Sequence, residues 1–273
     1  MRRLMEYKII SKRVVEIRRC LMPTGASVRK PRGTRRAGSS SEQKIRANEK
    51  QSRRNLARVI NCNFEAGDLL VSLKYDERHL PPQAHTGDAP GSEGYAAAET
   101  VLGKYLTRLR REYRKATGHA LRAVWVTANH SPKRDAPARL HHHLLLPADA
   151  MELSRKLWEK HGGRGTFMCE SLDNRGDHSD LAGYLYANVA GELPGKRRWS
   201  CSRGMERPIY TEPVEVADPE EILPEHGSVI RDVELTRDED GRVTGSYLRC
   251  LLDQPPKVRG GQIVLPKRGR RRP

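Results

Sequence analysis

The segment Arg139–Pro147, RLHHHLLLP, constrains the fold more than any other part of the chain. Three consecutive histidines lead into a continuous apolar run closed by proline, which predicts a buried strand that carries ligands. Successive side chains of a strand point to opposite faces, so we expect His141 and His143 on one face and His142 on the other. Two imidazoles spaced in this way can share one divalent metal, although a histidine triplet also fits structural histidines.

The 273-residue chain carries a formal net charge of +17, from 51 lysines and arginines against 34 acidic residues. Part of this excess lies in a basic C-terminal tail, but cations also occur within a predicted helix at 108–115 and a predicted loop at 196–198. The alternative is a basic tail on an otherwise neutral body. Because the positive charge is instead spread over the fold, nucleic acid is the favoured partner.

The five cysteines lie far apart and include no CxxC pair, which argues against a disulfide framework and against a zinc knuckle. No apolar run follows the basic N-terminus, and no stretch approaches membrane-spanning length. We therefore expect a cytoplasmic protein without a membrane partner. A GxxxxGK[ST] stretch is absent from the sequence, so no nucleotide-driven helicase domain is expected.

Apolar periodicity and turn residues divide the middle of the chain into alternating elements. The predicted strands are Leu69–Tyr75, Leu121–Thr127, the histidine segment and Gly163–Ser171, and the predicted helices are Ser41–Asn63, Tyr95–Ala116, Ala150–Lys160 and Ser179–Gly191. The order β-α-β-β-α-β followed by a helix predicts an α+β protein with a ferredoxin-like (split βαβ, RRM-like) antiparallel sheet. The first and third strands should then be neighbours, with helices on one face and the other face free for nucleic acid and metal.

Composition divides the chain into three parts. Residues 1–40 combine a strand or hairpin at Glu6–Met22 with a Gly/Ser/Pro/Arg linker, and residues 41–207 hold the predicted sheet. Residues 208–273 begin with an acidic, proline-rich linker or lid, continue as a hairpin of Val229–Arg237 and Arg242–Leu251, and end in the basic tail.

Two tyrosines of the last predicted helix are candidates for chemistry. Leu181, Leu185 and Val189 form the packing stripe of this helix; Tyr184 borders it, whereas Tyr186 lies about 200° further round the axis. Tyrosine suits phosphodiester cleavage when the product must be kept, because a phosphotyrosine bond conserves the energy of the broken linkage. The alternative interpretation is that both are ordinary amphipathic tyrosines.

The segment after that helix, PGKRRWSCSRG, gathers cations around an indole. Phosphate-binding cations and a base-stacking aromatic are what a single-strand binder uses, although a solvated loop tethered by one tryptophan fits the same pattern. The candidate DNA contacts here are Lys196, Arg197, Arg198, Trp199 and Arg203.

Several segments taken together resemble the rolling-circle replication-associated proteins of the HUH endonuclease superfamily, in the branch found in bacterial phages and plasmids. These segments are LLVSLKYDE, VWVTA, RLHHHLLLP, DLAGYLYANVAGE and GKRRWSCSRG, and the likeness covers most of residues 41–208. The resemblance implies a nickase that forms a 5′-phosphotyrosine link to single-stranded origin DNA, in a hairpin or loop, and frees a 3′-hydroxyl primer. A host helicase and polymerase in a bacterial cytoplasm would be its partners.

Carried over to this chain, the resemblance makes His141 and His143 ligands of Mn²⁺ or Mg²⁺ and Tyr184 the nucleophile. His130 is the candidate third ligand, and Lys74, Tyr75 and Asn188 join the candidate DNA contacts. The chain departs from the family in two places: Ala128 stands where an acidic ligand is usual, and Ala187 and Asn188 stand where a lysine is usual, for which Lys196 is a candidate substitute. A catalytically inactive nucleic-acid-binding protein on the same fold is consistent with these departures, and a transposase or relaxase that uses the same chemistry is a further alternative.

Overall fold

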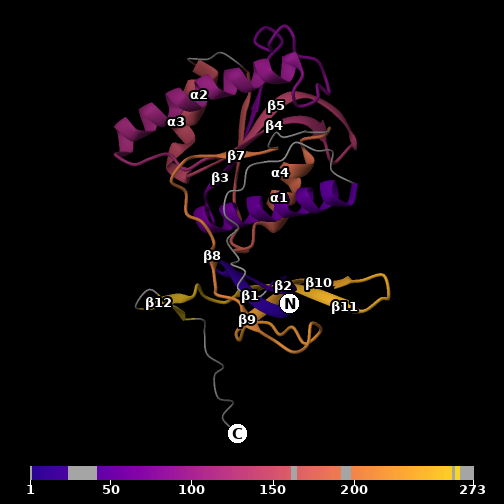
Figure 1. Cartoon of the computed structure of the whole chain (residues 1–273). Coiled ribbons are helices and arrows are strands. Elements are labelled where there is room, and N and C mark those ends of the chain that lie inside the picture. The colour runs from indigo at the N-terminus through magenta and orange to yellow at the C-terminus, as the bar shows by residue number, and fades with distance from the viewer. Residues whose placement is uncertain (1, 24–41, 161–164, 192–197, 260–261, 265–273) are drawn as a thin grey trace. The chain divides into compact units, whose positions relative to one another are not determined.

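The computed structural model describes residues 2–23, 42–160, 165–191, 198–259 and 262–264 (Figure 1). It is an α+β protein with two large antiparallel sheets. Two compact units divide the chain, one made of residues 1–49 with 207–273 and the other of residues 50–206. Within the described part of the chain, no helix has the length and apolar character needed to cross a membrane.

The first unit joins the two ends of the chain in one sheet of order β10-β11-β2-β1-β8, with β9 also paired to β1. Its strands are β1 (Arg2–Ser11), β2 (Val14–Pro23), β8 (Ile209–Tyr210), β9 (Val214–Glu215), β10 (Ser228–Arg237) and β11 (Val243–Leu252), and a separate hairpin forms from β12 (Lys257–Arg259) and β13 (Gln262–Val264). Both predicted hairpins are confirmed. The predicted linker at 24–41 lies outside the described residues.

The pairing of β11 with β2 explains why these terminal segments fold together. Ile17 lies opposite Leu248 and Val15 opposite Cys250, and all four side chains are almost fully buried in one cluster. The acidic segment after residue 208, predicted as a linker or lid, instead contributes β8 and β9 to the edge beside β1. Sequence periodicity within each hairpin could not reveal that the two hairpins are neighbours.

The second unit is built on a sheet of order β6-β3-β5-β4-β7, in which all the pairings are antiparallel. Its strands are β3 (Leu69–Lys74), β4 (Val124–Ser131), β5 (Ala136–Leu146), β6 (Phe167–Ser171) and β7 (Ser200–Cys201). Its helices are α2 (Glu93–Thr117), α3 (Met151–Arg155), α4 (Ser179–Ala187) and the larger part of α1 (Glu42–Asn63), from Lys50 on. Short helical turns flank α3 at Ala148–Ala150 and Lys156–Lys160. The predicted neighbours, the first strand and the histidine strand, are confirmed as the pair β3–β5.

Helices cover both faces of this sheet, so the prediction of one open face was wrong. The side chains of α2 and the α3 region pack with those of Leu73, Leu144 and Leu146 on one face. On the other face, buried side chains of α1 and α4 pack against Val126 and Leu145. Figure 1 shows α1 and α4 on the side of the sheet away from α2. The apolar stripe of α1 was expected, but periodicity alone does not say which face of a sheet a helix covers.

Helix α2 is bounded by two local signals. The hydroxyl of Ser92 accepts a hydrogen bond from the backbone N–H of Tyr95 at 3.2 Å, which caps the first turn. At the other end Gly118 adopts a left-handed φ of 76°, and its N–H donates to the carbonyl of Arg114. Because the cap is Ser92, the helix begins two residues before the predicted Tyr95.

The two units give a direct test of the domain division, because Trp125, Trp158 and Trp199 all lie in the second unit. Leu248→Ala should cost the first unit about 2–5 kcal/mol, since a fully buried leucine leaves a cavity on truncation. We expect the tryptophan fluorescence transition in urea to stay at its wild-type midpoint. Part of the far-ultraviolet circular dichroism signal should be lost at a lower urea concentration than in the wild type.

Leu185→Ala is the matched control, because Leu185 is equally buried but belongs to the second unit. It should lower the midpoint of the tryptophan transition. An equal shift of that transition by both variants would show that the units unfold as one.

Candidate active site

The alternation predicted for the histidine strand is confirmed. Strand β5 lies between β3 and β4, and His142 points into the cluster beneath α2, where it is fully buried. His141 and His143 point to the α1/α4 face, with their Nε2 atoms 3.1 Å apart and the ring of Tyr184 packed edge-on to His143. One strand therefore supplies a core histidine and an outward pair.

The outward pair brings its two Nε2 atoms within hydrogen-bond distance of each other. His141 Nδ1 donates to the carbonyl of Arg139 at 2.8 Å, which leaves the Nε2 lone pair unprotonated in the neutral ring. His143 Nδ1 lies 2.9 Å from Ser72 Oγ, a hydroxyl that can donate or accept. Ser72 was not predicted; its position directly opposite His143 on β3 would have identified it once the register was known.

Both rings of the pair are held in the neutral state that metal binding needs. Burial is the main cause that lowers the pKa of His143 to about 3, with smaller contributions from His141 and Lys74. Burial likewise lowers the pKa of His141. Lys74 lies opposite His141 on β3 with its side chain exposed, so the predicted DNA contact does border the pair.

The separation of the Nε2 atoms fits two adjacent positions of one metal. Imidazole nitrogens lie about 2.0–2.1 Å from a bound divalent ion such as zinc, so two of them at a right angle are about 3 Å apart. The 3.1 Å separation of His141 and His143 agrees with this value. With a metal on its Nε2, His143 would carry its proton on Nδ1 and donate it to Ser72, the usual outer hydrogen bond of a metal-binding histidine.

His130 is not brought into a common group with that pair. A bulge between Ala128 and His130 shifts the pairing with β5, so His130 lies opposite Pro137, while Ala128, which has no donor atom, lies opposite His141. The His130 ring contacts the carbonyl of Ala187 through Nδ1 and Asp135 through Nε2. No three His, Cys, Asp or Glu side chains among the described residues are grouped to hold a metal.

The structure separates the two tyrosines of α4. The Tyr184 ring centroid lies 5.5 Å from that of His143, on the face of the helix that packs on the sheet. The Tyr186 ring instead lies under the guanidinium of Arg198, whose Cζ atom is 4.9 Å from the ring centroid. The Tyr184 ring thus borders the histidine pair, as the helical periodicity predicted.

The end of α4 is fastened to the bulge of β4. The carbonyl of Asn188 accepts hydrogen bonds from the backbone N–H groups of Asn129 and His130. The Asn129 side chain both donates to the carbonyl of Ala190 at 3.0 Å and accepts from its N–H at 2.8 Å. Asn129 thus positions the helix that carries Tyr184, a role that its place in the sequence did not reveal.

Asn188 itself is buried and acts within the protein. Its side-chain amide donates to the carbonyl of Tyr184 at 2.8 Å, and the same side chain raises the pKa of His143, against the larger effect of burial. It was predicted to bond the tyrosine phenol or DNA, but its hydrogen bond is to the Tyr184 backbone instead.

The other predicted DNA contacts fall into three groups. Tyr75 is buried on the α2 face, where its hydroxyl lies 2.6 Å from His142 Nε2, so it is a core residue. Trp199 is half-buried and donates to Ser52 Oγ of α1 at 3.2 Å, Arg198 bonds the carbonyls of Val189 and Gly191, and Arg203 is exposed. Lys196 and Arg197 lie outside the described residues.

Searches against protein families, curated proteins and solved structures found no match to this chain.

The histidine roles are separable by mutation. His142 accepts or donates bonds at both ring nitrogens, to Tyr75 and Thr127, in a fully buried site. His142→Ala should therefore cost about 2–5 kcal/mol of unfolding free energy, since it opens a cavity and removes a hydrogen-bond partner from two buried hydroxyls. Urea unfolding followed by tryptophan fluorescence measures this loss.

His141→Ala is the matched change on the half-exposed side of the same strand. It should cost the fold much less but weaken Mn²⁺ binding at least about tenfold in calorimetric titration, because one of the two candidate ligands is removed. If His142→Ala weakened Mn²⁺ binding more than His141→Ala at a temperature where both are folded, the assignment of the pair would fail.

Proposed function

We propose that this protein is a metal-dependent DNA nickase and strand transferase that initiates rolling-circle replication. The observation that carries the proposal is the position of Tyr184, whose ring lies edge-on to His143 beside two convergent, neutral imidazoles. A phenol nucleophile next to a metal-binding pair is the minimum equipment for covalent cleavage of a phosphodiester.

The sheet supports this proposal. The strands β6-β3-β5-β4 are adjacent in that order, and helices connect β3 to β4 and β5 to β6. This is the arrangement expected of a split βαβ, ferredoxin-like core, on which HUH endonucleases are built. The histidine strand in the middle of the sheet then serves as the rigid platform for the chemistry.

His141 and His143 would hold Mn²⁺ or Mg²⁺ through Nε2, and the bound ion would withdraw charge from a non-bridging phosphate oxygen. The Tyr184 hydroxyl oxygen attacks phosphorus, a tyrosine–phosphate bond forms, and the bond from phosphorus to the 3′ oxygen breaks. The proton lost by the phenol is matched by the proton gained by the 3′-hydroxyl. Burial disfavours the imidazolium form of both rings, so neither carries a positive charge that would repel the ion.

Substrate DNA would approach as a single strand. Lys74 is exposed next to His141, and Arg203 and the half-buried Trp199 lie on the segment that follows α4. Such cations contact phosphates and an indole offers a face for base stacking, which together favour a single strand over a duplex at this site.

A catalytically inactive DNA-binding protein is the second candidate, and one observation favours it. Ala128, not an acid, lies opposite His141, and the bulge directs His130 elsewhere. With two protein ligands, a hard ion such as Mg²⁺ would depend on water and substrate phosphate for its remaining positions.

Tyr184→Phe removes a single oxygen from the proposed site. We expect it to lower nicking of single-stranded DNA in Mn²⁺ by more than about a thousandfold, because the nucleophile is lost, with unchanged DNA affinity. The measurement is gel separation of a labelled oligonucleotide pool, with anisotropy for binding.

Tyr186→Phe is the matched control on the same helix and should keep at least about a tenth of wild-type nicking, since its ring borders Arg198 rather than the histidines. Robust nicking by Tyr184→Phe would contradict the assignment. Metal-independent binding without nicking by any form of the protein would favour the inactive DNA-binding protein.

A further inference from the structure

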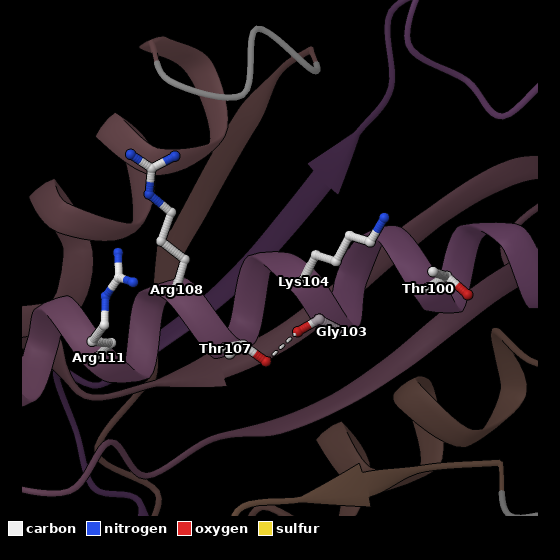
Figure 2. A pocket seen from close by; sticks show the side chains of 6 residues that line it. All are labelled: Thr100, Gly103, Lys104, Thr107, Arg108 and Arg111. Atoms are coloured by element: carbon white, nitrogen blue, oxygen red, sulfur yellow. Dashed lines mark hydrogen bonds between the residues drawn. The ribbon is translucent and has the colours of Figure 1, made fainter.

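Helix α2 presents a row of cations on its outer face. Lys104, Arg108, Arg111 and Lys115 are spaced by four, three and four residues, so they lie along one side of the helix, and all are exposed. A surface hollow runs along this side, lined by Thr100, Gly103, Lys104, Thr107, Arg108 and Arg111 (Figure 2). In Figure 2 the side chains of Arg108 and Arg111 extend away from one side of the helix.

Two of these cations form no direct ion pair with another described residue, although Arg108 is close enough to Glu112 to help lower the pKa of that carboxyl. Lys104 and Arg108 form no ion pair with any acidic side chain in the part of the chain that the structure describes. By contrast, Arg111 and Lys115 flank Glu112 at 2.9 and 3.8 Å. Arg110, on the next side of the helix, is stacked on Trp125 and belongs to the packing of the unit. Four cations against the single carboxylate of Glu112 leave this face positive, and Lys104 and Arg108 are the two that form no direct ion pair with it.

The chemistry of this face favours a duplex over a single strand. Single strands are held largely by stacking on aromatic rings, but Tyr95, Tyr105 and Tyr113 of α2 are all buried. The outer face offers cations and hydroxyls, which contact the sugar–phosphate backbone without reading bases. Its row of cations is about 16 Å long, a distance over which a duplex strand presents several phosphates.

We propose that the outer face of α2 is a second nucleic-acid surface, which binds the phosphate backbone of double-stranded DNA. It lies on the side of the sheet opposite the histidine pair, because α2 packs over His142 and not over His141 and His143. A protein with both surfaces binds a duplex on one side while a single strand occupies the other. This surface does not depend on the chemistry proposed for Tyr184.

The double variant Lys104→Gln with Arg108→Gln tests the surface. Glutamine is a good helix former, so α2 should remain folded, which circular dichroism verifies. The logarithm of the affinity for a short labelled duplex falls linearly with the logarithm of the salt concentration. We expect this slope to become less steep by about 1.8 in the double variant, at about 0.9 for each phosphate contact removed. Nicking of single-stranded DNA should be unchanged.

Arg237→Gln with Arg242→Gln is the control, because it removes the same charge from exposed positions near the β10–β11 turn. It should leave the slope for duplex DNA close to the wild-type value. An equal loss of slope in both double variants, an unchanged slope in the α2 variant, or an equal loss for single-stranded DNA of the same sequence would overturn the proposal. If the wild-type protein never nicks DNA, the proposed function is overturned, but the duplex-binding test of the α2 surface is unaffected.

Discussion

The register of β5 determines which histidines of the candidate site face α1 and α4 and which one is buried beneath α2. Its inward side chains, among them Leu140, His142 and Leu144, are fully buried beneath α2, while Leu145 is buried against α1 and α4. A shift of one residue would exchange the two faces and put His141 and His143 into the core. Because the sheet is covered on both sides, apolar burial and not the histidines themselves determines which imidazoles meet. The burial of the pair follows from the same constraint and keeps it neutral.

A second set of contacts fixes the orientation of α4, the helix that places Tyr184 beside the histidine pair. A short helix of nine residues such as α4 has little stability of its own, so its orientation depends on tertiary bonds. These are supplied by Asn188 and Asn129, which join the end of the helix to the bulge of β4. The bulge has a double effect: it accommodates the helix end, and it moves His130 out of line with His141. The same local irregularity therefore places the tyrosine and removes the expected third ligand.

The sequence predicted those features that depend on local periodicity. The alternation of the three histidines, the strands and helices of residues 42–187, and the choice of Tyr184 over Tyr186 as the ring beside the pair follow from periods of 2 and 3.6. Features that depend on contacts between distant segments could not be read in this way. Examples are the α1 and α4 cover on the second face, the pairing of β11 with β2, and Ser72 behind His143. Tyr75 was assigned to DNA, but its ring is buried against α2 and Trp158, contacts that the strand pattern does not reveal.

The central claim is that Tyr184 becomes covalently joined to DNA, and the most direct test is to map that junction. Wild-type protein is incubated with single-stranded DNA and Mn²⁺, digested with protease and nuclease, and the modified peptide is sequenced by mass spectrometry. The account predicts a nucleotide joined through its 5′ phosphate to Tyr184, within the peptide that contains α4. A nucleotide on Tyr186 or on any residue outside α4 would contradict it.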